Sequence, residues 1–275
     1  MTTIQKVIKY LAIALAIFLT VSIIGGILGA LGVVGLFTKK DPVAEELTTY
    51  SDFSEIRNLD IEINAADISI KEGTSFSVES NLKHLKVRET GGHLSLVDES
   101  TFRVNYKTFR EDHNHAVLTI YVPAGTVFDK VLLTTGAGRL YIESLTSDVL
   151  DFELGAGEVT IDTLSATKSV EIEGGAGKIT ISNGELHNLD LDMGVGELNL
   201  TAALQGRSDL NFGVGESNLT LLGNRDDYRV DIEKGIGSIT VDGKTVSDFG
   251  TGGNGANRVE IEGGIGAINV KFQNP

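Results

Sequence analysis

The stretch VEIEGGAGKITI, residues 170–181, contains the pattern that decides the fold. Apolar and polar residues alternate on both sides of the glycine triplet at residues 175–177. A period of two residues predicts half-buried β-strands. Two short strands, a glycine corner and a turn account for about 19–20 residues at normal strand lengths. The stretch is therefore expected to be most of one coil of a β-solenoid.

The triplet recurs along the C-terminal half of the chain, in steps of 19, 20, 19, 19, 22 and 29 residues. The last step is lengthened by residues 247–257, which are rich in Gly and Asn. Asn64-Ala65-Ala66, between alternating isoleucines, is interpreted as a degenerate earlier copy. The copies are Gly136-Ala137-Gly138, Gly155-Ala156-Gly157, Gly175-Ala176-Gly177, Gly194-Val195-Gly196, Gly213-Val214-Gly215, Gly235-Ile236-Gly237 and Gly264-Ile265-Gly266.

Glycine has a physical reason to occupy these corners. A sharp bend often needs positive φ, and stacked coils approach closely there, both of which glycine allows without a Cβ clash. One coil cannot bury its apolar face alone, so stacking must supply the core. The predicted fold is thus an all-β, β-helix-like solenoid built as a stack of single coils. A dinucleotide-binding interpretation is not favoured, because that motif must open a helix and strands follow here.

Residues 1–40 are predicted to be a short cytoplasmic tail and one transmembrane anchor. Residues 8–37 are almost wholly apolar, and about 20 such residues cross a bilayer. A cleaved signal peptide has a shorter apolar region, roughly 7–15 residues. The alternative is a cleaved signal peptide, with its cleavage site in the glycine-rich stretch at residues 25–30. We expect an uncleaved single-pass anchor in the cell membrane, with the large domain outside the cell.

The rest of the chain is divided by pattern into a charged stalk at 41–57, an N-terminal β region at 58–130 and the glycine-cornered solenoid at 131–275. The middle region is expected to cap one end of the solenoid. It includes a polar stretch at 101–115, interpreted as a long loop. At the other end, Lys271 and Pro275 are residue types that discourage edge pairing.

The charge is strongly asymmetric. Residues 1–40 hold four of the 23 basic residues and no acid, so the remaining 235 residues carry all 38 acids against 19 bases. Such a domain repels nucleic acid, which requires a basic footprint. Besides the membrane around the anchor, the expected partners are a protein, a cationic peptide or a cell-wall polymer with basic groups.

The acids gather on one predicted face. Residues two and four positions before each triplet are acidic in almost every repeat, and both positions point outward because the residue between them is apolar. We call these two columns the acidic wall. They consist of Asp151, Glu153, Glu171, Glu173, Asp190, Asp192, Asp209, Asn211, Asp231, Glu233, Glu260 and Glu262.

The acidic wall has two interpretations. Stacked carboxylates repel, and Ca²⁺ or Mg²⁺ would relieve that repulsion. The alternative is a solubilising face that prevents lateral aggregation. The candidate metal ligands are Asp151, Glu153, Glu171, Glu173, Asp190, Asp192, Asp231 and Glu233. No other cofactor is expected.

No catalytic residue is predicted, and the protein is not expected to be an enzyme. The chain has no cysteine, which removes thiolate nucleophiles and zinc-thiolate sites. His113 and His115, beside Glu111 and Asp112, form a possible metal cluster, although a His-x-His pair in a loop lacks a third spaced ligand. No carboxylate pair is set apart as a glycosidase dyad.

The segment Tyr121-Val122-Pro123-Ala124-Gly125, residues 131–142, the copy at residues 61–68 and the serial Gly-Ala-Gly triplets resemble the bacterial "putative adhesin" family, domain of unknown function 4097. The resemblance covers roughly residues 53–272. It implies a β-repeat, adhesin-like fold. Some members of the family are linked to cell-envelope stress systems. It implies no catalytic residues.

These observations lead to three hypotheses about the function of the protein. The first is a non-enzymatic, membrane-anchored cell-surface scaffold, adhesin-like, which presents the acidic wall to a partner. The second is a cell-envelope stress accessory or sensor that captures cationic peptides. The third, a polysaccharide-active β-helix enzyme, is disfavoured because such a site needs bases beside its acids to hold acidic sugars.

Overall fold

The computed structural model describes residues 47–100, 116–246 and 249–274. Four predicted features lie outside these ranges: the transmembrane anchor, residues 41–46 of the stalk, the loop at 101–115 and the His113–His115 cluster. Among the described residues, no helix is long and apolar enough to span a membrane.

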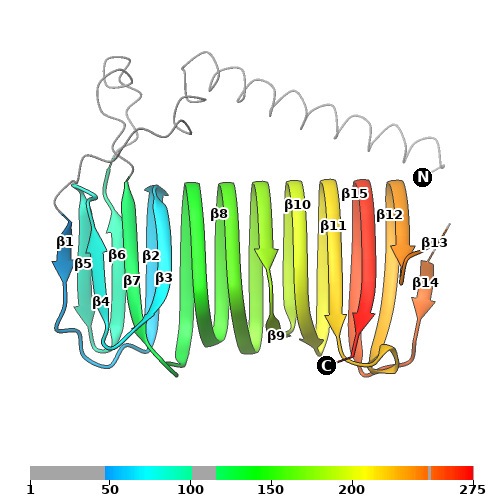
Figure 1. Cartoon of the computed structure of the whole chain (residues 1–275), viewed down its shortest axis with the longest axis horizontal. Coiled ribbons are helices and arrows are strands. Elements are labelled where there is room, and N and C mark those ends of the chain that lie inside the picture. The colour runs from blue at the N-terminus through cyan, green and yellow to red at the C-terminus, as the bar shows by residue number, and fades with distance from the viewer. Residues whose placement is uncertain (1–46, 101–115, 247–248, 275) are drawn as a thin grey trace, which may run out of the picture. The chain divides into compact units, whose positions relative to one another are not determined.

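The glycine repeats form consecutive coils of a parallel β-solenoid. Strand β8 (Phe128–Ile181) passes through the first triplets without interruption, and β9 (Gly184–His187), β10 (Leu189–Gln205) and β11 (Arg207–Leu222) follow it. The pairing of β8, β10 and β11 is parallel and places triplet on triplet, with Gly177 opposite Gly196 and Gly196 opposite Gly215. Figure 1 shows these coils side by side. The predicted all-β solenoid is confirmed.

The core lies between the two walls of each coil. Alternate side chains point inward, as the period of two requires, and the same register is filled in successive coils. Phe152, Ile172, Leu191 and Leu210 are all at most 1% exposed. Full burial of one such side chain stabilises the fold by roughly 1.5–3 kcal/mol. Because the neighbouring coils cover these side chains, each coil is stabilised mainly by its neighbours.

The N-terminal region contributes a coil of its own. Strands β2 (Asn58–Ala65) and β3 (Asp67–Gly73) pair in parallel with β8, and Ala65 lies opposite Ala137. The degenerate triplet Asn64-Ala65-Ala66 therefore stands in register with the glycine triplets. Strands β6 (His93–Asp98) and β7 (Val117–Pro123) pair in parallel with β2 and β3 on the side away from β8.

Antiparallel strands cover this end of the solenoid. Strand β4 (Ser77–Ser80) pairs with β7, β5 (Leu85–Thr90) pairs with β6, and β1 (Thr48–Tyr50) pairs with β4. Part of the predicted stalk is thus a strand of the sheet. The β region consists of a solenoid coil together with the strands that cover it.

The C-terminal coils do not stack in chain order, which the repeat pattern alone had implied. Strand β15 (Asn257–Gln273) lies between β11 and β12 (Tyr228–Val241) and is parallel to both. Figure 1 shows β15 inserted between them. The predicted terminal edge near Lys271 is therefore wrong, because Lys271 pairs with Thr220 inside the stack. The outer side of β12 is covered instead by β13 (Lys244–Val246) and β14 (Phe249–Gly252), both antiparallel.

The insertion of β15 makes two connections cross, the one from β11 to β12 and the one from β14 to β15. Because β15 occupies the place next to β11, the chain must pass over it to begin β12, and it does so through a 3₁₀ helix at Arg225–Asp227. Residues 253–256 then bring the chain back to the start of β15. This region is the one break in the repetition of the described C-terminal coils.

Candidate functional site

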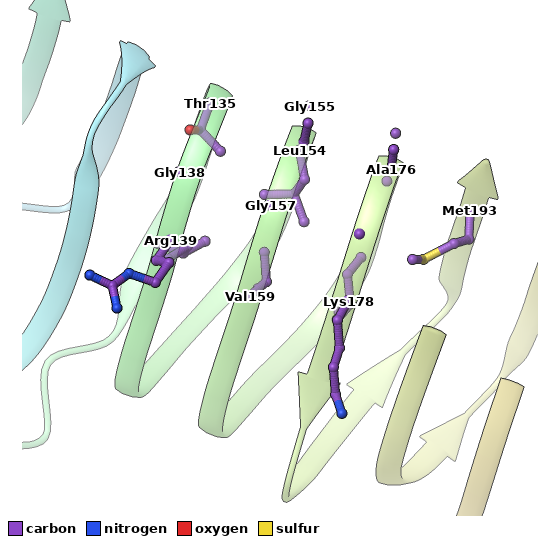
Figure 2. Close-up of a pocket in the computed structure, with 16 residues that line it drawn as sticks. Thr135, Gly138, Arg139, Leu154, Gly155, Gly157, Val159, Ala176, Lys178 and Met193 are labelled. Atoms are coloured by element: carbon purple, nitrogen blue, oxygen red, sulfur yellow. The ribbon is translucent and has the colours of Figure 1, made fainter. Parts of the chain in front are cut away.

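The glycine triplets form one edge of the solenoid, where each coil nearly touches the next. A Cβ on Gly157 would lie 1.8 Å from the carbonyl oxygen of Gly138, and one on Gly196 would lie 1.7 Å from that of Gly177. Both glycines also have positive φ, 151° and 146°. Figure 2 shows Gly138, Gly157 and Ala176 on neighbouring coils of β8. The predicted corner glycines are explained by backbone-to-backbone contact rather than by a ligand.

The acidic wall is continuous across β10, β11, β15 and β12. Asp190 lies opposite Asp209, Asp209 opposite Glu260, and Glu260 opposite Asp231. The candidate ligands Asp231 and Glu233 are separated from Asp190 and Asp192 by two coils, not by one. This greater separation follows from the insertion of β15.

Arginines offset part of the negative charge in the C-terminal part of the wall. Arg207, Arg258 and Arg229 lie opposite one another in three adjacent coils. Arg207 contacts Asp209 at 3.0 Å and Glu260 at 2.8 Å, while Arg258 pairs with Glu260. The expectation that the wall has no bases beside its acids is therefore wrong for this part.

The sequence did carry a signal for these arginines. Each one stands two residues before a wall acid: Arg207 before Asp209, Arg229 before Asp231 and Arg258 before Glu260. Residues two apart on a strand share a face, so the triple recurrence of Arg-x-acid marks a paired column. The acids form the more obvious column because they outnumber the arginines.

The middle part of the wall keeps a net negative charge. Glu153, Glu171, Glu173, Asp190 and Asp192 are all exposed. Within the described residues, the ion pairs of the wall involve other carboxylates, those of Asp151, Asp209, Asp231 and Glu260. These five exposed residues are the sub-region that we call the open acidic patch.

The carboxyl group of Asp190, in the open acidic patch, is affected by partial desolvation and by neighbouring acids. Partial burial raises the pKa of its carboxyl group above the ordinary value, and the charges of Asp192 and Asp209 raise it further. The only hydrogen bond to Asp192 from a described side chain comes from the Asn211 amide, 2.7 Å away. A positive group docked here would relieve the repulsion.

No group of three or more His, Asp and Glu side chains among the described residues is arranged to hold a metal ion. The wall acids stand in open columns along the strands, whereas Ca²⁺ takes six to eight oxygen ligands that converge on one point. A bound cation on the eight predicted ligands stays a prediction.

The opposite wall carries a hydrogen-bonded amide ladder, made of Asn199, Asn218, Asn269 and Thr240. The Asn218 amide donates to Asn199 at 3.0 Å, and the Asn269 amide donates to Asn218 at 2.9 Å. The Thr240 hydroxyl donates to Asn269. The ladder is continuous only because β15 places Asn269 between Asn218 and Thr240.

These features define a class of protein, a capped parallel β-solenoid with one acidic wall, one amide-bearing wall and a glycine edge. Residues 56–271 match the model of the family described as Toastrack DUF4097. The chain belongs to that family, and the resemblance recognised from its motifs is confirmed.

Several solved structures are similar over most of the chain. A "putative adhesin" from Parabacteroides distasonis is 14% identical, with 83% of this chain and 98% of that one covered and a TM-score of 0.45. A "putative adhesin" from Bacteroides fragilis is 14% identical, with 84% and 100% covered and a TM-score of 0.40. A "putative lipid binding protein" from Parabacteroides distasonis is 12% identical, with 82% and 96% covered and a TM-score of 0.36. A comparison with curated proteins finds no match.

Proposed function

We propose that this protein is a non-enzymatic, membrane-anchored scaffold of the cell surface that binds a basic partner through the open acidic patch. The observation that carries the proposal is the contrast within one wall. Arginines pair with Asp209, Glu260 and Asp231, one wall acid on each of β11, β15 and β12, whereas the five acids of the patch are exposed and make no ion pair with another described residue. A wall that served only for solubility would have no need of this division.

The geometry of the patch favours an extended or flat partner. Its acids repeat at the spacing of neighbouring strands, about 4.8 Å, on the outward face of a parallel stack. A partner whose positive groups recur along its own surface can meet several carboxylates at once. Multiple rim-like charge contacts raise the association rate and are weakened by salt.

The absence of enclosure supports a binding role over catalysis. General acid–base chemistry needs carboxyl groups held in unequal environments around a shielded substrate. The patch lies on an outward face, and its five carboxylates are exposed to solvent. We therefore assign the patch to recognition.

A charge-matched pair of variants tests the proposal in the full-length chain. The patch variant carries Glu171→Gln, Glu173→Gln and Asp192→Asn, and the control loses the same charge from the opposite wall through Glu158→Gln, Asp162→Asn and Glu216→Gln. Binding of an oligolysine probe and of a folded basic protein is measured by calorimetry at low and at physiological salt. We expect the patch variant to lose about tenfold or more in affinity and the control to lose little.

The outcomes separate the alternatives. Equal losses in both variants would reduce the effect to net charge and sink the patch as a site. No saturable heat with either probe would also sink it. Binding of oligolysine without binding of the folded protein would favour the second function, capture of cationic peptides.

The anchor requires its own test, since it rests on the apolar run at residues 8–37. We expect the chain to sediment with membranes and to lose this behaviour when residues 1–40 are removed. Protease added to intact cells is expected to cleave the domain. Resistance to protease before lysis and cleavage after it would contradict the proposed orientation.

A further inference from the structure

The crossing of the two C-terminal connections creates a cavity of about 880 Å³. It is bounded by the ends of β9, β10 and β11 on one side and by residues 226–228 and 254–257 on the other. Pockets that hold small ligands typically measure about 300–1,000 Å³. The cavity lies where the repeat is interrupted, and none of the acids of the acidic wall contributes to it.

The floor of the cavity is built on Tyr228. This side chain is 2% exposed, and its hydroxyl group donates to the carbonyl oxygen of Leu222 at 2.6 Å. The same hydroxyl oxygen accepts a hydrogen bond from the backbone N–H of Leu204 at 3.3 Å. The crossing connection is thereby tied both to β10 and to the end of β11.

The rim is fixed in the same way. The Asn257 side-chain oxygen accepts from the backbone N–H of Gly206 at 3.1 Å, and the Asp227 carboxylate accepts from the N–H of Asn224 at 2.9 Å. The Asn257 bond ties the second crossing segment to the end of β10, and the Asp227 bond fixes the 3₁₀ turn of the first, before any ligand arrives. A preformed site has a lower entropic cost of binding.

Several other polar groups that line the cavity are free to bind a ligand. The side chains of Asn183, Gln205, Asp226 and Asn254 line it and make no hydrogen bond to another described residue. An amide offers two donors and an acceptor oxygen, and a carboxylate offers acceptors only. Together they can satisfy a ligand that both donates and accepts many hydrogen bonds.

The charge of the lining limits the ligand further. Glu185, Asp226 and Asp227 are acidic, and the lining contains no Lys, Arg or His. A phosphate, a carboxylate or an acidic sugar would meet only repulsion from these groups. Ala203, Leu222 and Ala256 add apolar surface, which suits the C–H faces of a ring.

We infer that this cavity is a binding site for an uncharged saccharide. Sugar hydroxyl groups donate to the three carboxylates and exchange hydrogen bonds with the four amides of Asn183, Gln205, Asn254 and Asn257. The site is separate from the open acidic patch, so the protein would have two recognition surfaces of different chemistry.

The test uses the full-length chain and three trisaccharide probes of matched size: maltotriose, chitotriose and the amine-bearing chitosan trimer. The cavity variant is Asn183→Ala with Asp226→Ala, two exposed positions whose loss is not expected to unfold the chain. Glu158→Ala, on the opposite wall, is the control. We expect saturable heat with at least one uncharged probe, a loss of about tenfold or more in the cavity variant, and no change in the control.

Three results would overturn the inference. The first is no saturable binding of maltotriose or chitotriose up to millimolar concentration. The second is equal binding by the parent and the cavity variant. The third is binding of the chitosan trimer alone with strong salt dependence, which would show attraction of a cation rather than recognition of a saccharide.

Discussion

At the scale of single residues, two constraints act on the second glycine of each triplet. Gly196 has a φ of 146°, which L-side chains rarely adopt, and its absent Cβ would overlap the carbonyl oxygen of Gly177. Gly91 also has positive φ, at 60°, but a Cβ there would meet nothing within 4 Å. A comparison of substitutions at Gly196 and Gly91 therefore separates the effect of backbone strain from the effect of close approach.

We expect Gly196→Ala to lower the free energy of unfolding by roughly 2–5 kcal/mol, because strain and overpacking add. Gly91→Ala carries strain alone and is expected to cost about 1–2 kcal/mol. Urea denaturation of both variants and the parent measures the difference. Equal losses would show that stacking at the glycine edge contributes little.

Asp190 and Asp148 are expected to affect the pH dependence of stability in opposite directions. Partial burial, with the charges of Asp192 and Asp209, raises the pKa of Asp190, whereas hydrogen bonds from Lys168 and Thr167 lower the pKa of Asp148. A raised pKa means that stability falls as pH rises through the interval from the unfolded to the folded value. A lowered pKa means that stability is lost as pH falls through the folded value.

At neutral pH we therefore expect Asp190→Asn to raise the melting temperature and Asp148→Asn to lower it. Below both pKa values the two variants should approach the parent, because the native carboxyl groups are then neutral as well. Melting curves between about pH 2 and pH 8 measure this, because the lowered pKa of Asp148 requires the acid end of the scan to lie well below the ordinary carboxyl range. A pH-independent offset in either variant would mean that packing, rather than charge, causes the change.

At the scale of elements, the sequence was sufficient to predict each glycine-cornered coil but not the order of the coils. Inward residues such as Ile172 and Leu191 follow from alternation, and Ala65 opposite Ala137 follows from the interpretation of Asn64-Ala65-Ala66 as a degenerate triplet. The triplet of β15 matches its neighbours as well as that of β12 does, since every coil offers the same backbone surface. Periodicity therefore cannot distinguish a terminal coil from an inserted one.

The candidate site divides in the same way. The acidic wall was predictable because its columns follow the strand period, and the arginines that pair with it carried a period-two signal. The cavity around Tyr228 was not predictable. It is built from Gln205, Asp226 and Asn254, which become neighbours only because the connections cross.

The position of β15 inside the stack leads to a prediction about how strongly its backbone amides are protected from hydrogen exchange. The amides of β15 lie between two hydrogen-bonded neighbours, although this strand is the last in the chain. We expect residues 259–270 to exchange with deuterium as slowly as those of β11. Peptide-level exchange measured by mass spectrometry tests this. Fast exchange typical of a frayed terminus, with slow exchange in β12, would place β15 outside the stack.

At the scale of the whole solenoid, both ends of the parallel stack are closed by antiparallel strands. Strand β4 covers β7 at one end, and β13 and β14 cover the outer side of β12 at the other. An uncovered parallel coil would present unpaired N–H and C=O groups, which promote strand addition by another chain. The covering strands thus prevent coil-on-coil association between molecules.

Removal of the C-terminal cover should reverse this. We expect a variant in which residues 243–252 are replaced by a Gly-Ser linker of equal length to self-associate, because the outer groups of Val230, Ile232 and Ile239–Val241 lose their partners. Lys244→Ser with Thr245→Ser keeps the backbone pairing and serves as control. Light scattering of the full-length chains at rising concentration measures the mass. An unchanged mass for the linker variant would mean that β12 is protected by its own twist or charge, and that the cover has another role.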